Sequence, residues 1–236
     1  MASENGEARA ATYARRVAAN QGEELALGLS AELLNASLDA LAQREPAFAA
    51  ALVRAGYPEP RISERGYVTL LRTIVGQQIS VGAARSVWAK LDATAGGAAD
   101  PANILAASDD ALRGAGLSRQ KISYAKSLAE EVIAGRLDLT DLPADDDEAV
   151  AQLVRVKGIG RWSAEIYLLF AEGRADVWPA GDLAVQIQIG HILGLAGRPS
   201  EGELRALAEN WRPHRGVAAI FAWHYYKTPA PLAVPA

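Results

Sequence analysis

Apolar residues recur along this chain at intervals of three and four positions, a spacing typical of amphipathic α-helices. In the segment LSAELLNASLDALAQ, Ser30 is placed to cap a helix, and Leu33, Leu34, Leu38 and Leu41 fall on one face of it. The pattern therefore predicts an opening helix that buries a stripe of leucines.

Further helices are predicted wherever a start signal precedes an apolar stripe. They cover residues 67–79 and 81–93, a helix opened by Asp100-Pro101, a helix begun by Ser108-Asp109-Asp110 and stopped at Gly114-Ala-Gly116, and residues 121–133. Proline supports the third of these assignments, because a first helical turn tolerates it. Short helices joined by short connections follow from this pattern.

The second half of the chain continues in the same way. The acidic run Asp145–Asp147 marks a helix start, where the helix dipole favours negative charge. The segment LAVQIQIGHILGLAG after Asp182 alternates at first, but its length and the lack of a partner strand favour a buried helix. We therefore predict an all-α protein of about ten helices in two lobes with a cleft between them.

The predicted domain organisation is simple. Residues 1–25 form a flexible N-terminus, residues 26–227 form the helical domain with its second lobe at about 65–180, and residues 228–236 form a flexible tail.

Composition narrows the kinds of function that fit. The 236 residues include no cysteine, which excludes disulfides, thiolate zinc sites and iron–sulfur clusters. His191, His214 and His224 lack metal-site spacing, so no tightly held transition metal is expected. The chain has neither a membrane-length apolar run nor a secretory signal, and a cytoplasmic location is expected.

The net charge of −4 is unusual for a protein that binds nucleic acid. The charge is unevenly distributed, however, because residues 61–136 carry more basic than acidic side chains, whereas residues 138–148 are rich in acids. The acidic run is interpreted as a solvated loop and helix start.

Residues 151–182 carry the most informative motif. In VKGIGRWSAE, Gly158 and Gly160 flank Ile159 between two apolar helices, and Lys157 and Arg161 flank the turn. Glycine allows a close backbone approach to a ligand, and the unpaired amides at a helix start bind phosphate. Alternatively, the two glycines only end one helix and begin the next.

The carbonyl groups of the same turn suggest a metal site. Those of Val154, Val156 and Ile159 are placed to surround a monovalent cation such as Na⁺ or K⁺. No other cofactor is expected.

Four segments together resemble the helix-hairpin-helix (HhH-GPD) DNA glycosylase superfamily, and its 3-methyladenine DNA glycosylase II branch in a compact form. They are LLRTIVGQQISVGAA, GLSRQKISYAKSLAE, VKGIGRWSAEIYLLF and DVWPAGDLAVQ. The resemblance implies base-excision repair by a monofunctional glycosylase, since Trp162 occupies the position of the Schiff-base lysine of bifunctional members. It also implies Asp182 as the catalytic carboxylate, although an N-cap role for Asp182 is the structural alternative.

The resemblance also implies a pocket for the flipped base, lined by Trp223, with Trp162 and Trp178 as further candidates. An alkylated base carries positive charge, which favours electron-rich indoles. The alternative for each tryptophan is core packing, which is also the interpretation of Trp88 and Trp211. Ile166 replaces a pocket tyrosine of some relatives.

DNA contacts outside the hairpin follow from the same resemblance. Gln78, with Gln77 beside it, is expected to fill the gap left by the flipped base, and Ser118 and Arg119 to contact a second phosphate. A helix-terminal amide with only local bonds is the alternative for Gln78.

The expected partner is double-stranded DNA containing alkylated bases such as 3-methyladenine or 7-methylguanine, bound by a monomer, in a bacterial nucleoid-associated setting. Two alternatives remain open at this point. One is a non-catalytic DNA-binding module, and the other is a glycosylase for a neutral damaged base.

Overall fold

The computed structural model of this chain describes residues 28–228. The predictions for residues 1–25 and 229–236 concern segments outside this range. Within it the structure contains twelve α-helices and one 3₁₀ helix and no strand, so the all-α prediction is confirmed. The predicted cleft between lobes remains a prediction.

The described residues form two compact units. Unit 1 comprises Ser63–Tyr167, and unit 2 comprises Gly28–Ile62 together with the chain from Leu168 onward. The chain passes from unit 1 to unit 2 within helix α10 (Arg161–Phe170), earlier than the residue near 180 at which the sequence placed the end of the second lobe.

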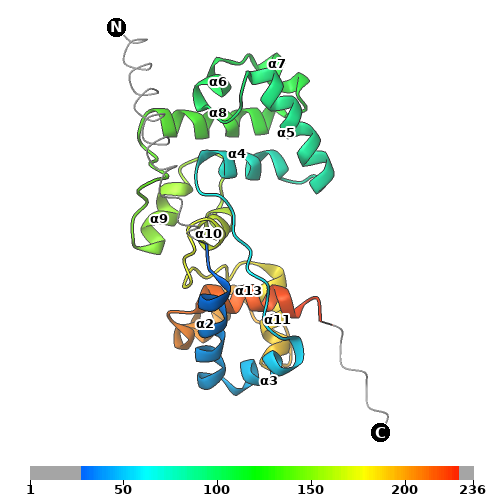
Figure 1. Ribbon diagram of the computed structural model, residues 1–236, viewed down its shortest axis with the longest axis vertical. Coiled ribbons are helices and arrows are strands. Elements are labelled where there is room, and N and C mark those ends of the chain that lie inside the picture. Colours follow the sequence, from blue (N-terminus) through cyan, green and yellow to red (C-terminus); the bar gives the residue numbers. More distant parts are fainter. Residues whose placement is uncertain (1–27, 229–236) are drawn as a thin grey trace. The chain divides into compact units, whose positions relative to one another are not determined.

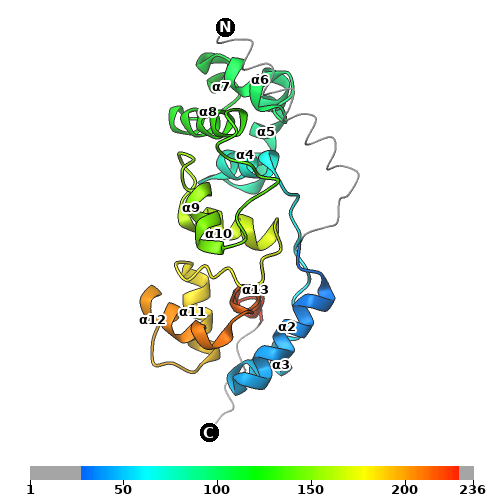
Figure 2. The ribbon, with the colours of Figure 1, turned by 90° about the vertical axis from the view of Figure 1, so that its left-hand side faces the viewer.

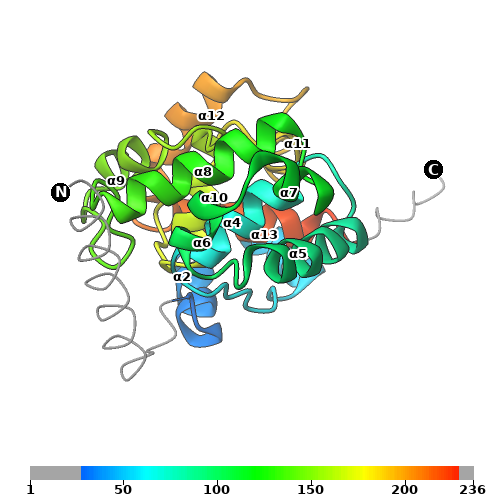
Figure 3. The ribbon, with the colours of Figure 1, turned by 90° about the horizontal axis from the view of Figure 1, so that it is seen from above.

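Unit 1 is organised around helix α8. Besides the first part of α10, its helices are α4 (Tyr67–Gly76), α5 (Val81–Ala95), α6 (Pro101–Ala106), α7 (Asp109–Gly114), α8 (Arg119–Ile133) and α9 (Asp146–Leu153). Helix α8 packs against α4, α6 and α7, and Figure 3 shows α6 and α7 lying against it. Fully buried leucine and isoleucine side chains from these helices form the core, among them Leu71, Ile74, Leu91, Leu112 and Leu128.

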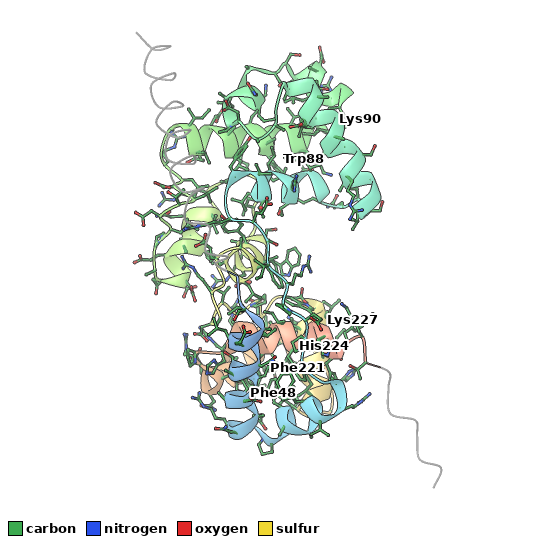
Figure 4. All side chains as sticks on the ribbon, viewed as in Figure 1. Phe48, Trp88, Lys90, Phe221, His224 and Lys227 are labelled. Atoms are coloured by element: carbon green, nitrogen blue, oxygen red, sulfur yellow. The ribbon has the colours of Figure 1, made fainter. Side chains whose placement is uncertain are left out.

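Unit 2 is organised around helix α13. Its helices are α2 (Ala31–Arg44), α3 (Pro46–Ala55), α11 (Leu183–Ile192), α12 (Glu201–Ala208), the 3₁₀ helix η1 (Glu209–Trp211) and α13 (Arg215–Tyr225). Helix α13 packs against α2, α3 and α11 (Figure 1), and Figure 2 shows α2 and α3 along one side of it. Phe48 of α3 lies 6.0 Å from Phe221 of α13, centroid to centroid (Figure 4).

The helix starts follow the predicted capping chemistry. The side chains of Ser30, Asp100, Ser108 and Asp145 each accept a hydrogen bond from a backbone N–H in the first turn of their helix. Such caps satisfy backbone donors that have no partner inside the helix. The segment after Asp182 is the helix α11, as its length indicated.

Three local predictions need correction. Leu33 is 59% exposed, because the buried face of α2 carries Leu34, Leu38 and Leu41 and not their neighbour. Helix α4 ends at Gly76 and not at residue 79, since a tight turn follows. Gly114 still belongs to α7, and the change of direction occurs at Gly116, where φ is +104°.

The segment that leads into Asp182 is tied to α13. The carboxylate of Asp176 accepts hydrogen bonds from the Arg212 guanidinium at 2.8 Å and from the Arg215 guanidinium at 2.8 and 3.0 Å. The Arg215 and Asp176 side chains are only 12% and 18% exposed. This ion-pair network fixes the approach to the helix that begins after Asp182.

No helix among residues 28–228 has the length and apolar character needed to span a membrane.

Candidate functional site

The hairpin between α9 and α10 depends on Gly158. Its φ is +85°, a conformation that L side chains rarely adopt. A Cβ added at Gly158 would lie 2.1 Å from the ring of Tyr124 in α8, so the backbone rests directly on that ring. A Cβ at Gly160 would meet nothing within 4 Å. The first glycine is therefore required by packing, whereas the second faces open space.

Two side chains of unit 1 hold the hairpin backbone. The hydroxyl of Ser127 in α8 accepts a hydrogen bond from the Lys157 N–H at 3.2 Å. The Gln77 amide Nε2 donates to the Gly158 carbonyl at 2.8 Å. Ile159 is buried and the Lys157 side chain is exposed. The apolar residue of the turn thus anchors it, and the basic side chain beside it reaches solvent.

Arg161 is engaged within the protein. Its guanidinium pairs with Asp147 at 2.7 Å and with the buried Glu165 at 2.9 Å. These partners raise the pKa of Arg161, with the hydrogen bond to Asp147 as the largest cause. Part of the positive charge predicted at this turn is therefore neutralised locally.

The predicted cation site has one carbonyl already in use, because the Val156 oxygen accepts a hydrogen bond from the Ile159 N–H at 3.0 Å. A carbonyl oxygen has two lone pairs, so this bond is compatible with a further ligand. Within the described residues, no cluster of three or more histidine, aspartate or glutamate side chains is placed to bind a metal ion.

The turn after α4 presents Gln78 in a strained conformation. The Ile79 N–H donates to the Gly76 carbonyl at 3.4 Å, and Gln77 has φ −55° and ψ 131°, as in a type II turn. Gln78 occupies the position that favours glycine, with φ +57°, and no other non-glycine residue in the described part of the chain has a positive φ. Its side chain is exposed. Strain of this kind persists where the surrounding structure holds it in place.

The second predicted phosphate contact lies at the start of α8. The Ser118 hydroxyl caps this helix by accepting from the Lys121 N–H, and Arg119 is exposed. The Lys121 ammonium instead donates to the Val75 carbonyl at 2.7 Å, and burial lowers its pKa. Lys121 thus holds the end of α4 and does not extend into solvent.

Asp182 lies in unit 2 at the start of α11. Its Oδ1 accepts hydrogen bonds from the Val185 N–H at 2.9 Å and from the Trp223 indole N–H at 3.1 Å. The first bond is an N-cap, and the second comes from the central helix α13. The carboxylate is therefore fixed in orientation by two donors and remains partly exposed.

Trp223, the hydrogen-bond partner of the Asp182 carboxylate, packs against a further aromatic side chain. Trp223 lies 5.8 Å from Phe170, ring centroid to centroid, and the guanidinium of Arg61 lies 5.1 Å above the Phe170 ring. All three residues belong to unit 2. The arrangement joins a packed pair of aromatic rings, of which Phe170 is buried and Trp223 partly exposed, to a held carboxylate.

The other two predicted pocket tryptophans differ from each other in burial. Trp178 is buried and packs edge-on against Trp211 at 5.7 Å, which is the core-packing alternative, and its indole N–H is buried without a hydrogen-bond partner. Trp162 is 49% exposed on the unit 1 part of α10. Trp88 of α5 packs under the Arg72 guanidinium, 4.7 Å from its ring centroid.

Comparison with known proteins identifies the family. The family described as HhH-GPD superfamily base excision DNA repair protein matches residues 71–213, which include the hairpin and Asp182. The chain belongs to this superfamily.

Individual relatives agree with this HhH-GPD assignment. DNA-3-methyladenine glycosylase 1 of Schizosaccharomyces pombe is 29% identical over 161 residues, which cover 66% of this chain and 71% of that protein. The crystal structure of a DNA-3-methyladenine glycosidase from Bacillus halodurans superposes with a TM-score of 0.75 at 30% identity, over 81% of this chain and 89% of that one.

A second similar solved structure is that of an S. pombe 3-methyladenine DNA glycosylase in complex with abasic DNA. It superposes with a TM-score of 0.64 at 26% identity, over 79% of this chain and 94% of that one. Together these relatives place this chain among the DNA glycosylases, in the 3-methyladenine glycosylase branch.

Two residues of the cluster that includes Trp223 were not predicted. Phe170 ends the apolar run of α10, and its sequence signal is only that of a core residue. Arg61 lies in a segment without regular structure, far from Phe170 along the chain. Only tertiary structure brings Arg61, Phe170 and Trp223 together.

Proposed function

We propose that this protein is a monofunctional DNA glycosylase that flips alkylated bases out of duplex DNA and hydrolyses their N-glycosidic bonds, with Asp182 as the catalytic carboxylate. The observation that carries this proposal is the partly exposed Asp182 side chain, held by the Val185 N–H and by the indole of Trp223, which packs against Phe170.

The chemistry of the reaction explains why a fixed carboxylate is needed. Cleavage of the bond between C1′ and the base nitrogen builds positive charge on the sugar, as in glycoside hydrolysis. A carboxylate that is already oriented stabilises this charge without reorganising during the reaction. The two N–H donors to Oδ1 supply that orientation in Asp182.

The aromatic surface fits a cationic leaving base. Bases such as 3-methyladenine and 7-methylguanine carry positive charge and leave readily, so strong acid catalysis is not required. Electron-rich rings attract such cations by stacking and cation–π interaction. We assign this role to Trp223, with Trp162 as a further candidate. Phe170 is buried under the Arg61 guanidinium, and its part is to pack against Trp223.

The absence of a lysine at the covalent position supports hydrolysis without lyase activity. Trp162 stands two residues after Gly160, where bifunctional members carry the Schiff-base lysine. An indole forms no Schiff base, and water is then the nucleophile. Asp182 is placed to orient or deprotonate that water.

Double-stranded DNA is the proposed partner, bound by a monomer. The DNA complex of the S. pombe relative supports DNA as the partner. The open approach at Gly160, the exposed Lys157 and the start of α8 at Arg119 supply phosphate contacts, and Gln78 fills the gap left by the flipped base. A monovalent cation held by the carbonyls of Val154, Val156 and Ile159 would add positive charge at the hairpin.

Release of free bases from methylated duplex DNA tests the proposal, with Asp182→Asn as the paired control. The wild type should release 3-methyladenine or 7-methylguanine, and the variant should bind damaged duplex with little release. Asparagine keeps the size of the side chain and its carbonyl oxygen, so the cap to Val185 is retained. Release by both proteins would remove Asp182 from catalysis, and release by neither would point to another lesion or to a binding module.

A further inference from the structure

We propose that Gln77 is a positioning residue that couples the Gln78 side chain to the hairpin, so that the phosphate grip and the gap-filling residue act as one rigid part. This inference rests on the proposed function and deepens it. It assigns to Gln77 a role in setting damage specificity, in place of direct contact with DNA.

The coupling is a single hydrogen bond between two segments far apart in sequence. The Gln77 Nε2 donates to the Gly158 carbonyl at 2.8 Å. Gln77 is the residue immediately before Gln78 in the type II turn, and Gly158 is the first glycine of the hairpin. The bond thus fixes the base of the turn whose exposed tip is Gln78.

Helix α8 supports both partners of this bond from below. Lys121 donates to the Val75 carbonyl at 2.7 Å, which holds the end of α4. About one turn further along α8, the Tyr124 ring fills the space beneath Gly158, and about one turn beyond it Ser127 accepts from the Lys157 N–H. Side chains spaced three residues apart project from one side of a helix. Helix α8 therefore supports both the turn and the hairpin.

The coupling matters because Gln78 has a left-handed backbone conformation. A left-handed conformation is unfavourable for a residue with a Cβ. A glycine at this position would avoid the cost but would carry no side chain. The turn keeps a long polar side chain at its tip, and it relies on the bond to Gly158 to hold that side chain in place.

The consequence concerns discrimination between damaged and intact DNA. Phosphate contacts at the hairpin carry no sequence information, whereas filling a gap in the base stack depends on damage. Because the hairpin and the turn are rigidly connected, a hairpin that binds the DNA backbone also places Gln78 correctly at the gap. Loss of the connection should therefore weaken binding at a gap more than binding to intact duplex.

The test is a double-mutant cycle on DNA binding. The probes are a duplex with one tetrahydrofuran abasic site and the same duplex without it. The proteins are wild type, Gln77→Leu, Gln78→Ala and the double variant. The ratio of the two affinities is the measured quantity, and melting temperature confirms folding. Gln43→Leu makes the same chemical change at an exposed position of α2 in unit 2 and serves as the matched control.

We expect Gln77→Leu to lower the affinity ratio by about threefold to tenfold, as for loss of one neutral hydrogen bond. In the Gln78→Ala background the same change should have no further effect, because the coupled side chain is absent. Gln43→Leu should leave the ratio unchanged.

An equal loss of ratio in both backgrounds would overturn the proposal, and so would an unchanged ratio, which includes an equal loss of affinity for both duplexes. Gln77→Glu, which keeps the side-chain size but places an acceptor against the Gly158 carbonyl, provides the same cycle if Gln77→Leu fails to fold. The abasic duplex contains no base to excise at the site, so a failure of base release leaves this readout intact.

Discussion

The indole N–H of Trp223 donates a hydrogen bond to Oδ1 of Asp182 at 3.1 Å. The same oxygen accepts from the Val185 N–H at 2.9 Å, and Trp223 also packs 5.8 Å from Phe170. The residue predicted to stack on the base thus also orients the proposed catalytic carboxylate. Its two functions are separable, because phenylalanine keeps an aromatic ring and lacks the N–H.

Trp223→Phe should lower kcat for base release by about tenfold to a hundredfold, as expected for loss of a hydrogen bond to a charged group. The affinity for damaged duplex should change much less, because the ring remains. Single-turnover kinetics and equilibrium binding on the same duplex separate the two effects. A large loss of affinity with unchanged kcat would assign Trp223 to binding alone.

Gly158→Ala should destabilise the hairpin, whereas Gly160→Ala should not. The first change places a Cβ 2.1 Å from the Tyr124 ring at a positive φ, and the second places it in open space. We expect a lower melting temperature only for Gly158→Ala. Both variants should bind duplex DNA more weakly, since a methyl group at Gly160 obstructs the approach of a phosphate.

The decisive comparison is the salt dependence of binding by the stable variant. Gly160→Ala should reduce the dependence of affinity on salt concentration, because a phosphate contact is lost. Unchanged affinity and salt dependence in Gly160→Ala would remove this face of the hairpin from the DNA interface.

Gln78→Gly should lower the base-release activity while the stability stays close to that of the wild type or rises. Glycine relieves the left-handed strain at φ +57°, so the free energy of unfolding should stay within about 1 kcal/mol of the wild-type value or rise. Base release should fall, because the gap-filling side chain is lost. Urea denaturation and base release measure the two effects, and unimpaired release would contradict the assigned role of Gln78.

Asp176→Ala should destabilise unit 2 by about 2 kcal/mol, between the values typical of exposed and buried ion pairs. It removes one of the two carboxylates that pair with the guanidinium groups of Arg212 and Arg215, and leaves them only Glu209. Asp110→Ala is the matched control, since its pair with Arg113 is exposed. The prediction fails if urea denaturation gives equal stability losses for the two variants.

Stability should fall with pH below neutrality because of His214. Burial lowers the pKa of its imidazole below the ordinary value of 6.5, the Arg44 cation adds to the effect, and Asp176 opposes it. In the window below 6.5 the unfolded state therefore binds more protons than the folded state, and stability is lost as pH falls through it. His214→Gln should reduce the change of the denaturation midpoint with pH between about pH 7 and about pH 5, where histidine titrates. An unchanged slope would show that His214 does not titrate in this window.

The sequence by itself determined the helices and their starts. Capping depends on a serine or aspartate and the few residues after it, so Ser30, Asp100, Ser108 and Asp145 could be assigned from local pattern. The same local chemistry identified the glycine turn at Gly158. It also marked Asp182 as a helix cap, which the structure confirms, whereas the catalytic role of Asp182 followed from the family resemblance and stays a proposal.

Only the tertiary structure decided which side chains meet. The bonds from Gln77 to Gly158 and from Trp223 to Asp182 join positions 81 and 41 residues apart, and no local pattern encodes such pairs. Burial likewise separated Trp178, which packs against Trp211 in the core, from the exposed Trp162. An indole in a helical pattern has the same periodicity in both settings, because its surroundings are supplied by distant parts of the chain.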